Sequence, residues 1–343
     1  MKNTFQVGKS LEEMKAALDG KAERYDVVFS NPPYQVNDGG GTGSSAVPIY
    51  HEIVMYVIDH LKPHYVCMIT PSRWMAGGKG LDDYRDRMIH DKRLRLIQDF
   101  PGNTEVFETV SIQGGVSYFL WDRDYNSLCE WSAANGGILR DLGEFDVVVR
   151  NNMSAQIVIK IKASHKGSFC DEKVLSLNPF GVRSDFGAWI EEITNSVKCV
   201  MSGKKDKRIR IEDCSDEHSV MGKWKVVVSK ATIEGSTYTG DARKLLMSLQ
   251  ILPPATICTE TYLVVGSFGS KGEAENFASY VKTKFYRFML SLRVISQNMS
   301  RKKFSFVPDL GNYSKAWTDE ELYKHFNLTI KEIEHIEKSI KAF

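Results

Sequence analysis

The sequence predicts an α/β fold in which a sheet with alternating helices is followed by a mixed α+β domain. Over roughly the first 120 residues, short apolar runs alternate with segments of helical apolar spacing, a pattern typical of a largely parallel sheet. Around residues 122–150 the pattern becomes irregular, and beyond it strands and helices mix without regular alternation. The chain has 343 residues, and a domain usually takes about 150. We therefore expect two domains, residues 1–145 and residues 146–343.

The elements of the first half follow from apolar spacing and from local start and stop signals. Ser10 and Glu13 have the spacing of a capping box, which predicts a helix over residues 10–18. A strand over residues 25–29 must end before Pro32, because proline cannot donate to a sheet ladder. Further strands are expected at residues 65–69, 94–100 and 115–120, with helices at 49–61 and 80–90.

In the second half we expect strands at residues 224–228 and 262–265 and helices at 271–295 and 318–340. Thr318 followed by Glu321 predicts a helix cap rather than an acidic catalytic cluster. No acidic pair followed by Glu-x-Lys stands on an expected strand, so we expect no nuclease in this chain.

Composition excludes several classes of protein. No apolar run approaches the ~18 residues that a membrane span needs. The first eight residues lack the pattern of a secretion signal, so we expect a soluble protein of the cytoplasm. The six cysteines are scattered without a CxxC pair, which predicts neither a zinc cluster nor a disulfide framework, and no metal site is expected.

Local charge is more informative than the formal net charge of +2. The densest basic runs are residues 204–210 and 301–303, and either run could bind phosphates or form a solvated loop. A glycine-rich segment at residues 38–45 lacks the Gly-Lys-Ser/Thr ending of a phosphate-binding loop, so we interpret it as a mobile loop near an active site.

The tetrapeptide Asn31-Pro32-Pro33-Tyr34 follows the first expected strand directly, where open α/β sheets place ligands. The Asn31 side-chain oxygen and the Pro32 carbonyl could accept the two protons of an exocyclic amine such as that of adenine. The two prolines restrict the backbone because their φ angles are locked. Tyr34 could stack on a base extruded from a duplex.

Residues 26–35 resemble the catalytic motif of adenine-specific DNA methyltransferases of restriction-modification systems. The resemblance continues downstream into motifs of the branch whose cofactor motifs come first and whose target-recognition domain comes last, as in fused restriction-methylation proteins. The segments that carry it are residues 48–51, 68–74, 77–81, 99–101, 114–121, 178–181 and 300–306.

The resemblance implies a partial Rossmann-like methyltransferase sheet in residues 1–145 and a DNA target-recognition domain in residues 146–343. It implies S-adenosylmethionine as methyl donor, double-stranded DNA as substrate and catalytic roles for Asn31, Pro32, Pro33 and Tyr34. Phe107 falls where the family often places an aromatic on the second face of the flipped base, although a core phenylalanine is an equal alternative. The candidates for DNA contacts are Arg183, Lys230, Arg301 and Lys302.

The cofactor pocket of the family comes from strands that precede the catalytic strand. Only about 25 residues precede that strand here, and a βαβ unit alone takes about 30. We therefore expect the pocket to be incomplete in this chain and residues 25–29 to form an apolar sheet edge. Such an edge invites pairing with another chain, so we expect a homodimer or a separate cofactor-binding partner. The alternative function is a non-catalytic DNA-recognition module with a vestigial methyltransferase half.

Overall fold

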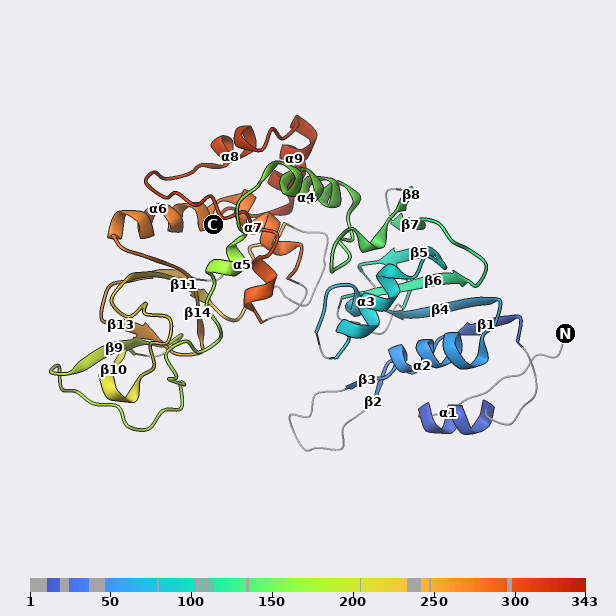
Figure 1. The fold of residues 1–343 in the computed structure, drawn as a ribbon, viewed down its shortest axis with the longest axis horizontal. Coiled ribbons are helices and arrows are strands. Elements are labelled where there is room, and N and C mark those ends of the chain that lie inside the picture. The colour runs from blue at the N-terminus through green and yellow to red at the C-terminus, as the bar shows by residue number, and fades with distance from the viewer. Residues whose placement is uncertain are drawn as a thin grey trace. The chain divides into compact units, whose positions relative to one another are not determined.

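The computed structural model describes residues 11–18, 25–36, 47–78, 80–102, 106–107, 112, 114–133, 136–203, 205–232, 242–246, 248–294 and 298–343. The glycine-rich segment 38–45 and Ser10 lie outside these residues. The described chain divides into two compact units, which meet in sequence between Arg150 and Asn151. Each unit is described by itself below (Figure 1).

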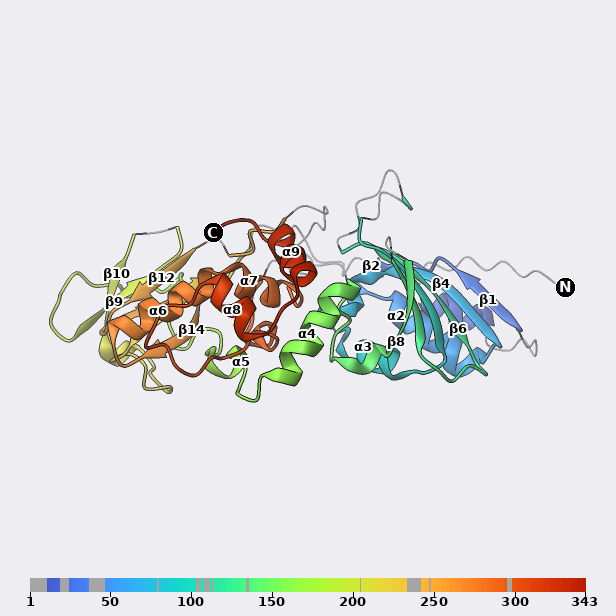
Figure 2. The same ribbon diagram turned by 90° about the horizontal axis from the view of Figure 1, so that it is seen from above.

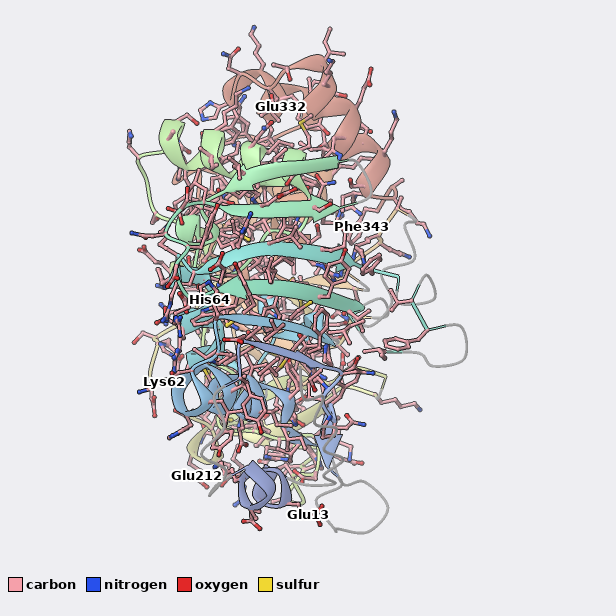
Figure 3. All side chains as sticks on the ribbon, turned by 90° about the vertical axis from the view of Figure 1, so that its right-hand side faces the viewer. Glu13, Lys62, His64, Glu212, Glu332 and Phe343 are labelled. Atoms are coloured by element: carbon pink, nitrogen blue, oxygen red, sulfur yellow. The ribbon has the colours of Figure 1, made fainter. Side chains whose placement is uncertain are left out.

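Unit 1 is built on a six-stranded mixed sheet with the order β1-β4-β6-β5-β7-β8 (Figures 1 and 3). β1 pairs with β4 in parallel, and β5 pairs with β7 in parallel. β6 is antiparallel to both of its neighbours, and β8 is antiparallel to β7. The strands are Val27–Ser30 (β1), Tyr65–Pro71 (β4), Leu94–Phe100 (β5), Val116–Asp122 (β6), Cys129–Ala133 (β7) and Gly136–Arg140 (β8).

The expectation of a largely parallel sheet is therefore wrong. β6 follows β5 without a helix among the described residues between them, and it inserts between β4 and β5 against their direction. A buried internal strand has the same apolar composition whichever way it runs, so its direction cannot be read from spacing alone. The expected irregularity over residues 122–150 is also wrong in part, because β7 and β8 lie there.

Helices cover one face of this sheet. Asp82–His90 (α3) and Tyr50–Tyr56 (α2), which continues into a π-helical turn at Val57–Leu61, pack with the strands around one apolar core (Figure 2). Val66 and Met68 of β4 point into that core and are at most 1% exposed. On β1, by contrast, Phe29 is 79% exposed and Val27 is 47% exposed. Among the described strands, β1 is thus the outermost of its sheet, as expected for an apolar edge strand.

Three further short elements complete unit 1. Leu11–Leu18 (α1) falls within the helix expected there. After β1, Gln35–Val36 (β2) pairs antiparallel with Val47–Pro48 (β3), directly before α2 begins. This small ladder joins the segment that follows β1 to the start of α2.

Unit 2 combines two three-stranded sheets with several helices. One sheet has the order β10-β9-β13 and the other β12-β11-β14. Its strands are Ser196–Val200 (β9), Lys207–Arg210 (β10), Trp224–Ser229 (β11), Leu249–Leu252 (β12), Thr256–Cys258 (β13) and Tyr262–Phe268 (β14). Its helices are Asn152–Ser164 (α4), Cys170–Lys173 (α5), Lys271–Lys282 (α6), Lys284–Ser291 (α7), Asp319–His325 (α8) and Ile330–Ser339 (α9).

Each of the two long helices expected in unit 2 is divided in the structure. Thr283 is extended between α6 and α7, and its hydroxyl accepts a hydrogen bond from the Tyr286 N–H. Asn327 has a left-handed φ of 50° between α8 and α9, and Thr329 caps α9. The expected cap at Thr318 is confirmed, because Thr318 and Glu321 form a capping box. Local caps thus interrupt patterns whose apolar spacing alone reads as continuous.

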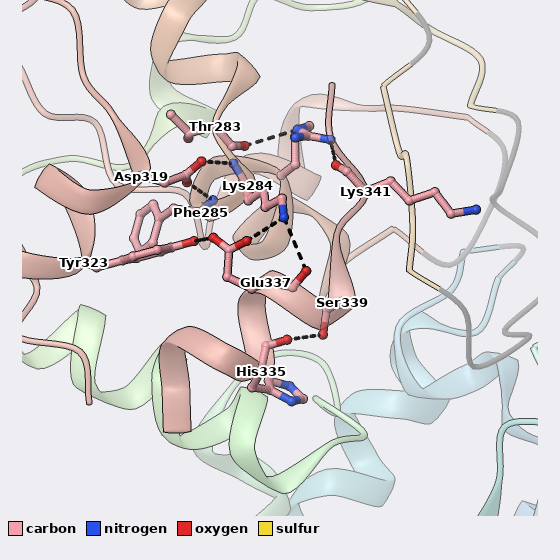
Figure 4. Close-up of polar contacts among 10 residues, drawn as sticks. Thr283, Lys284, Phe285, Asp319, Tyr323, His335, Glu337, Ser339 and Lys341 are labelled. Carbon is pink, nitrogen blue, oxygen red and sulfur yellow. Dashed lines mark hydrogen bonds and ion pairs between the residues drawn. The ribbon is translucent and has the colours of Figure 1, made fainter. Parts of the chain in front are cut away.

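The acidic residues of the C-terminal segment hold helices together (Figure 4). The Asp319 carboxylate accepts hydrogen bonds from the backbone N–H groups of Lys284, at 3.0 Å, and Phe285, at 2.8 Å. Glu337 accepts from Lys284 Nζ and from the Tyr323 hydroxyl. These contacts give both carboxylates a structural role, because each joins two helices.

No helix in the described part of the chain is long and apolar enough to cross a membrane. All six cysteines are free thiols. Within the described ranges, no group of three or more His, Cys, Asp or Glu side chains comes together as metal ligands.

Candidate active site

Several connecting segments leave unit 1 at the same end of the sheet. β1, β4 and β5 run in one direction, because β1 is parallel to β4 and β6 is antiparallel to both β4 and β5. The chain therefore leaves Ser30, Pro71 and Phe100 at one end, which we call the carboxyl end. The segment Asn31–Tyr34 and the 3₁₀ turn Ser72–Met75 both begin there. Open α/β sheets place ligands at this end.

The tetrapeptide is anchored at both of its own ends. Asn31 is exposed and Pro32 is buried. The Ile49 N–H donates to the Tyr34 carbonyl at 3.1 Å, and the β2–β3 ladder begins with the next residue. Burial of Pro32 and this hydrogen bond restrain the backbone, while the Asn31 amide stays open to solvent.

Tyr34 is half-buried and packs against the core beneath α2 and the sheet. Its hydroxyl is buried and has no hydrogen-bond partner among the described residues. Burial disfavours the charged phenolate and raises the pKa of Tyr34 to about 12. Tyr34 is therefore a neutral, partly accessible aromatic ring beside Asn31.

A buried carboxylate ties the neighbouring segments together at the carboxyl end. Asp99 is 2% exposed and lies one residue before the end of β5. Its Oδ1 accepts from the Ser72 hydroxyl at 2.9 Å, and Arg150 donates to both carboxylate oxygens at 2.6 Å. Arg150 also donates to the Gly114 carbonyl at 2.7 Å. One ion pair therefore joins the segments after β4 and β5 to the last residue of unit 1.

Gly115 allows the chain to pass closely over the end of β5. Its φ is +77°, and a Cβ built there would lie 2.2 Å from the Phe100 carbonyl oxygen. Its own carbonyl accepts from the Ser72 N–H at 3.0 Å. Only glycine fits this position, because a side chain would collide with backbone.

The other sequence candidate in unit 1, Phe107, lies between β5 and β6 and is half-buried. The segment that carries it also leaves the sheet at the carboxyl end. β6 separates β5 from β4, so at ~4.8 Å per strand β5 lies about 14 Å from β1. The contacts of the described residues do not join Phe107 to the tetrapeptide, and its role stays a prediction.

The four candidates for DNA contacts, all in unit 2, lie on segments that touch one another. The Lys230 N–H donates to the Thr261 carbonyl at 2.9 Å, and the Lys230 carbonyl accepts from Met299, two residues before Arg301, at 2.8 Å. Ser184, beside Arg183, donates to Glu260 through its N–H at 2.9 Å. We call Arg183, Lys230, Arg301 and Lys302 the basic edge of unit 2.

Individual members of the basic edge differ in their partners. The Arg183 side chain is 69% exposed and lies 3.5 Å from Asp185. Arg301 is exposed and donates from Nε to the Asp171 carbonyl at 2.7 Å. The Ser202 N–H donates to the Thr261 hydroxyl at 3.0 Å, which brings the basic run around Lys205 to the same place. The structure thus gathers cations that are far apart in sequence.

Sequence reasoning missed the group around Asp99. Ser72 and Asp99 lie in segments that carry the family resemblance, so the resemblance could have drawn attention to them. Arg150 had no such signal, because it pairs with Asp99 across 51 residues. Arg150 also lies beyond residue 145, the predicted end of the first domain.

The described residues do not by themselves fit S-adenosylmethionine. The resemblance places the cofactor-binding strands beside the catalytic strand, yet in the described ranges β1 has β4 as its one strand neighbour. The outward Phe29 is apolar and 79% exposed. Among the described residues, neither a glycine turn nor an acidic residue placed to bind a ribose accompanies β1 on its outer side.

The exposed Asn31 and the half-buried ring of Tyr34 thus lie in the segment that follows β1 at the carboxyl end of the sheet. Comparisons with known proteins show which protein family this part of the chain resembles. Residues 1–107, about a third of the chain, match the Eco57I restriction-modification methylase family. An uncharacterized adenine-specific methylase of Mycoplasma pneumoniae is 35% identical over 104 residues, which are 30% of this chain and 24% of that protein. The resemblance to adenine-specific methylases is thus confirmed for this segment, which spans about a quarter of the relative.

Solved structures show weaker likenesses. The type IIG restriction endonuclease BpuSI matches with a TM-score of 0.34 and 12% identity, over 91% of this chain and 49% of that chain. A type I restriction-modification methyltransferase subunit from Streptococcus thermophilus matches with a TM-score of 0.24 and 13% identity, over 36% of this chain and 31% of that chain. Likenesses of this size establish neither the fold nor the activity of the chain.

Proposed function

We propose that this chain is part of a site-specific DNA adenine methyltransferase of a restriction-modification system. It would transfer a methyl group from S-adenosylmethionine to the exocyclic amine of an adenine flipped out of the duplex. The observation that carries the proposal is the exposed Asn31 amide on a restrained backbone at the carboxyl end of the sheet. The match of residues 1–107 to the family supports it. Unit 1 would be part of a Rossmann-like catalytic domain and unit 2 the target-recognition domain.

The residues of unit 1 would orient the adenine. Asn31 Oδ1 and the Pro32 carbonyl would accept the two protons of the amine, directing its lone pair at the methyl group. Tyr34 and Phe107 would stack on the base. S-adenosylmethionine, when bound, supplies the methyl group as the electrophile. The proton can leave to solvent after transfer, so the mechanism needs no general base.

The basic edge of unit 2 would contact DNA. Its cations come from three segments joined through hydrogen bonds to residues 260 and 261 or to one another, which supports a shared contact surface. Neutralised phosphates release counterions, and each contact makes binding more salt-dependent. Arg301 and Lys302 would therefore contribute mainly to affinity and little to the choice of sequence.

The exposed edge of β1 would pair with another polypeptide that completes the sheet. Val27 and Phe29 are exposed on a strand whose outer side has no strand neighbour in the described chain. In the purified chain we propose a second copy as the occupant. Sedimentation velocity should then show a dimer for the wild type and a monomer for Phe29→Ser. A monomeric wild type would contradict self-association.

The methyltransferase proposal is tested by substituting Asn31. Cells that carry the complete gene should contain N6-methyladenine at one DNA sequence, detectable by long-read sequencing. Asn31→Ala should lower the rate of methylation by at least about 100-fold, the usual effect of removing one positioned polar group from an active site. Asn126→Ala is the matched control, because Asn126 is exposed at the opposite end of the sheet.

Unchanged methylation by Asn31→Ala would contradict the proposed role of the tetrapeptide. If the wild-type protein bound one DNA sequence without methylating it, the alternative function, a non-catalytic DNA-recognition module, would replace the proposal.

A further inference from the structure

The turn that follows β4 carries an arginine, Arg73, for which no partner is found among the described residues. Arg73 is the second residue of the 3₁₀ turn Ser72–Met75, and it is half-buried. In the part of the chain that the structure describes, its guanidinium makes no hydrogen bond or ion pair. Guanidinium groups are always charged, and leaving a partly buried one unpaired costs stability. A residue kept in this state is a candidate for binding an anion that is not part of the chain.

The backbone around Arg73 is held firmly. The Ser72 N–H donates to the Gly115 carbonyl at 3.0 Å, and the Arg73 carbonyl accepts from Gly77 at 2.9 Å. The Met75 carbonyl accepts from the Val148 N–H at 2.7 Å. The Cα of Arg73 therefore has a fixed position at the carboxyl end, as a preorganised binding group requires.

Two other arginines at this end of the sheet, Arg85 and Arg150, pair with groups of the protein. The Arg85 side chain is 6% exposed and donates to the carbonyls of Gly77, at 3.0 Å, and Asp146, at 2.9 Å. Arg150 binds Asp99 and Gly114, as described above. Both guanidinium groups are thus saturated by the protein itself. Arg73 has the same charge in the same region and none of these contacts.

Two observations place Arg73 near the tetrapeptide. β4 is parallel to β1, with Ser30 paired to Met68, so the segments after both strands start side by side. The charge of Arg73 also acts on Tyr50, whose pKa burial raises and Arg73 lowers. Tyr50 follows Ile49, the residue whose N–H binds the Tyr34 carbonyl. The segment that carries Arg73 therefore starts beside the tetrapeptide segment, at the same end of the sheet.

We propose that Arg73 binds a backbone phosphate of the DNA strand that carries the flipped adenine. This inference rests on the proposed function. The planar guanidinium can donate two parallel hydrogen bonds to a phosphate, a geometry that an ammonium group does not offer. Held at the same end as Asn31, it would fix the sugar-phosphate backbone while Asn31 holds the base. Arg73 is then a positioning residue for the target nucleotide.

The test measures how binding depends on salt. The full chain would be titrated with a duplex containing the sequence methylated in cells, at several salt concentrations. Each phosphate contact contributes about −0.9 to the slope of log K against log salt. Arg73→Gln should therefore make the slope shallower by about 0.9, whereas Arg73→Lys, which keeps the charge, should retain most of it.

The matched control is Lys62→Gln. Lys62 is an exposed cation at the opposite end of the sheet, where His64 also lies (Figure 3). Its loss should leave the slope unchanged. Thermal unfolding of all three variants shows whether they are folded, and a slope comparison at equal folded fraction remains valid if one variant is less stable.

The outcomes separate the two proposals. If the wild type binds the duplex and Arg73→Gln keeps the wild-type slope, the role of Arg73 is overturned and the methyltransferase proposal stands. If Lys62→Gln changes the slope as much as Arg73→Gln does, a general charge effect replaces the specific contact. If the wild type neither binds nor methylates DNA, both proposals fail.

Discussion

The two ends of the sheet in unit 1 use the same residue types in different ways. At the amino end, the cations Arg87, Lys92, Arg93, Arg95 and Arg123 all pair with aspartates, and their side chains are 40–51% exposed. At the carboxyl end, Arg85 and Arg150 are 6% and 16% exposed and bind backbone carbonyls as well as carboxylates. At the amino end the cations thus stay half-exposed, although two of their partners, Asp91 and Asp122, are buried. The carboxyl end is held together by buried charge.

The difference in burial of the ion pairs indicates that the carboxyl end is held more rigidly than the amino end. Buried ion pairs are costly to desolvate, and exposed ones contribute little. Asp99 and Arg150 join the turn after β4, the end of β5 and Gly114, so these segments hold one another in place. Under the proposed function, this rigidity would help the site to hold a flat base. Removing charges from the two ends should therefore have unequal effects.

The largest effect is expected from Asp99→Asn. The substitution leaves the Arg150 guanidinium in a buried place without its counter-charge, which costs about 3–5 kcal/mol. Urea unfolding monitored by tryptophan fluorescence would measure the change. Asp124→Asn, on the exposed amino end, should change stability by less than about 0.5 kcal/mol. Equal losses in the two variants would erase the distinction between the ends.

A smaller loss is expected from Gly115→Ala. The left-handed φ and the collision of a Cβ with the Phe100 carbonyl should cost at least about 2 kcal/mol. Gly78→Ala is the control, because nothing lies within 4 Å of a Cβ built at that position. The same unfolding experiment serves both variants. If Gly115→Ala were as stable as Gly78→Ala, the close passage over β5 would not be required.

The smallest effect is expected from Arg87→Gln at the amino end. Arg87 and Asp59 form a two-bonded pair that is about 40% exposed on both sides, worth about 0.2–1 kcal/mol. The hydrogen bonds from Arg87 hold the pKa of Asp59 below its usual value. The contribution is therefore present above the unfolded pKa of about 4 and is lost as the pH falls through the lower folded pKa.

Differential scanning calorimetry at several pH values would test this sign. The Tm difference between wild type and Arg87→Gln should be largest near neutral pH and should vanish below the folded pKa of Asp59. A difference that grows on acidification would show that another group, not Asp59, responds to Arg87.

Local signals predicted much of the fold. The strand expected at residues 94–100 coincides with β5, and the first strand ends at Ser30, directly before the tetrapeptide. The predictions failed where a decision depended on distant residues. The direction of β6 depends on its pairing with β4 and β5, and the break at Thr283 depends on a cap that apolar spacing does not show.

The same distinction applies to the candidate site, where some residues were predicted from the sequence and others were recognised only in the structure. Asn31 and Tyr34 were found from their order in a tetrapeptide, because rigid acceptors beside an aromatic form a local chemical pattern. Arg73 stands in a recognisable segment, but only the folded chain shows that no described residue pairs with it. The gathering of Arg183, Lys230 and Arg301 along one edge depends on contacts between loops that no spacing rule relates.

The sequence by itself determined the position of the tetrapeptide at a strand end, the cap at Thr318 and the resemblance of residues 1–107 to a methylase family, because each depends on neighbouring residues. The tertiary structure decided which end of the sheet is rigid, which arginine side chains pair with groups of the protein and which strand lies at the edge of the sheet. These outcomes depend on burial, and burial is set by residues that are far apart along the chain and close together in space.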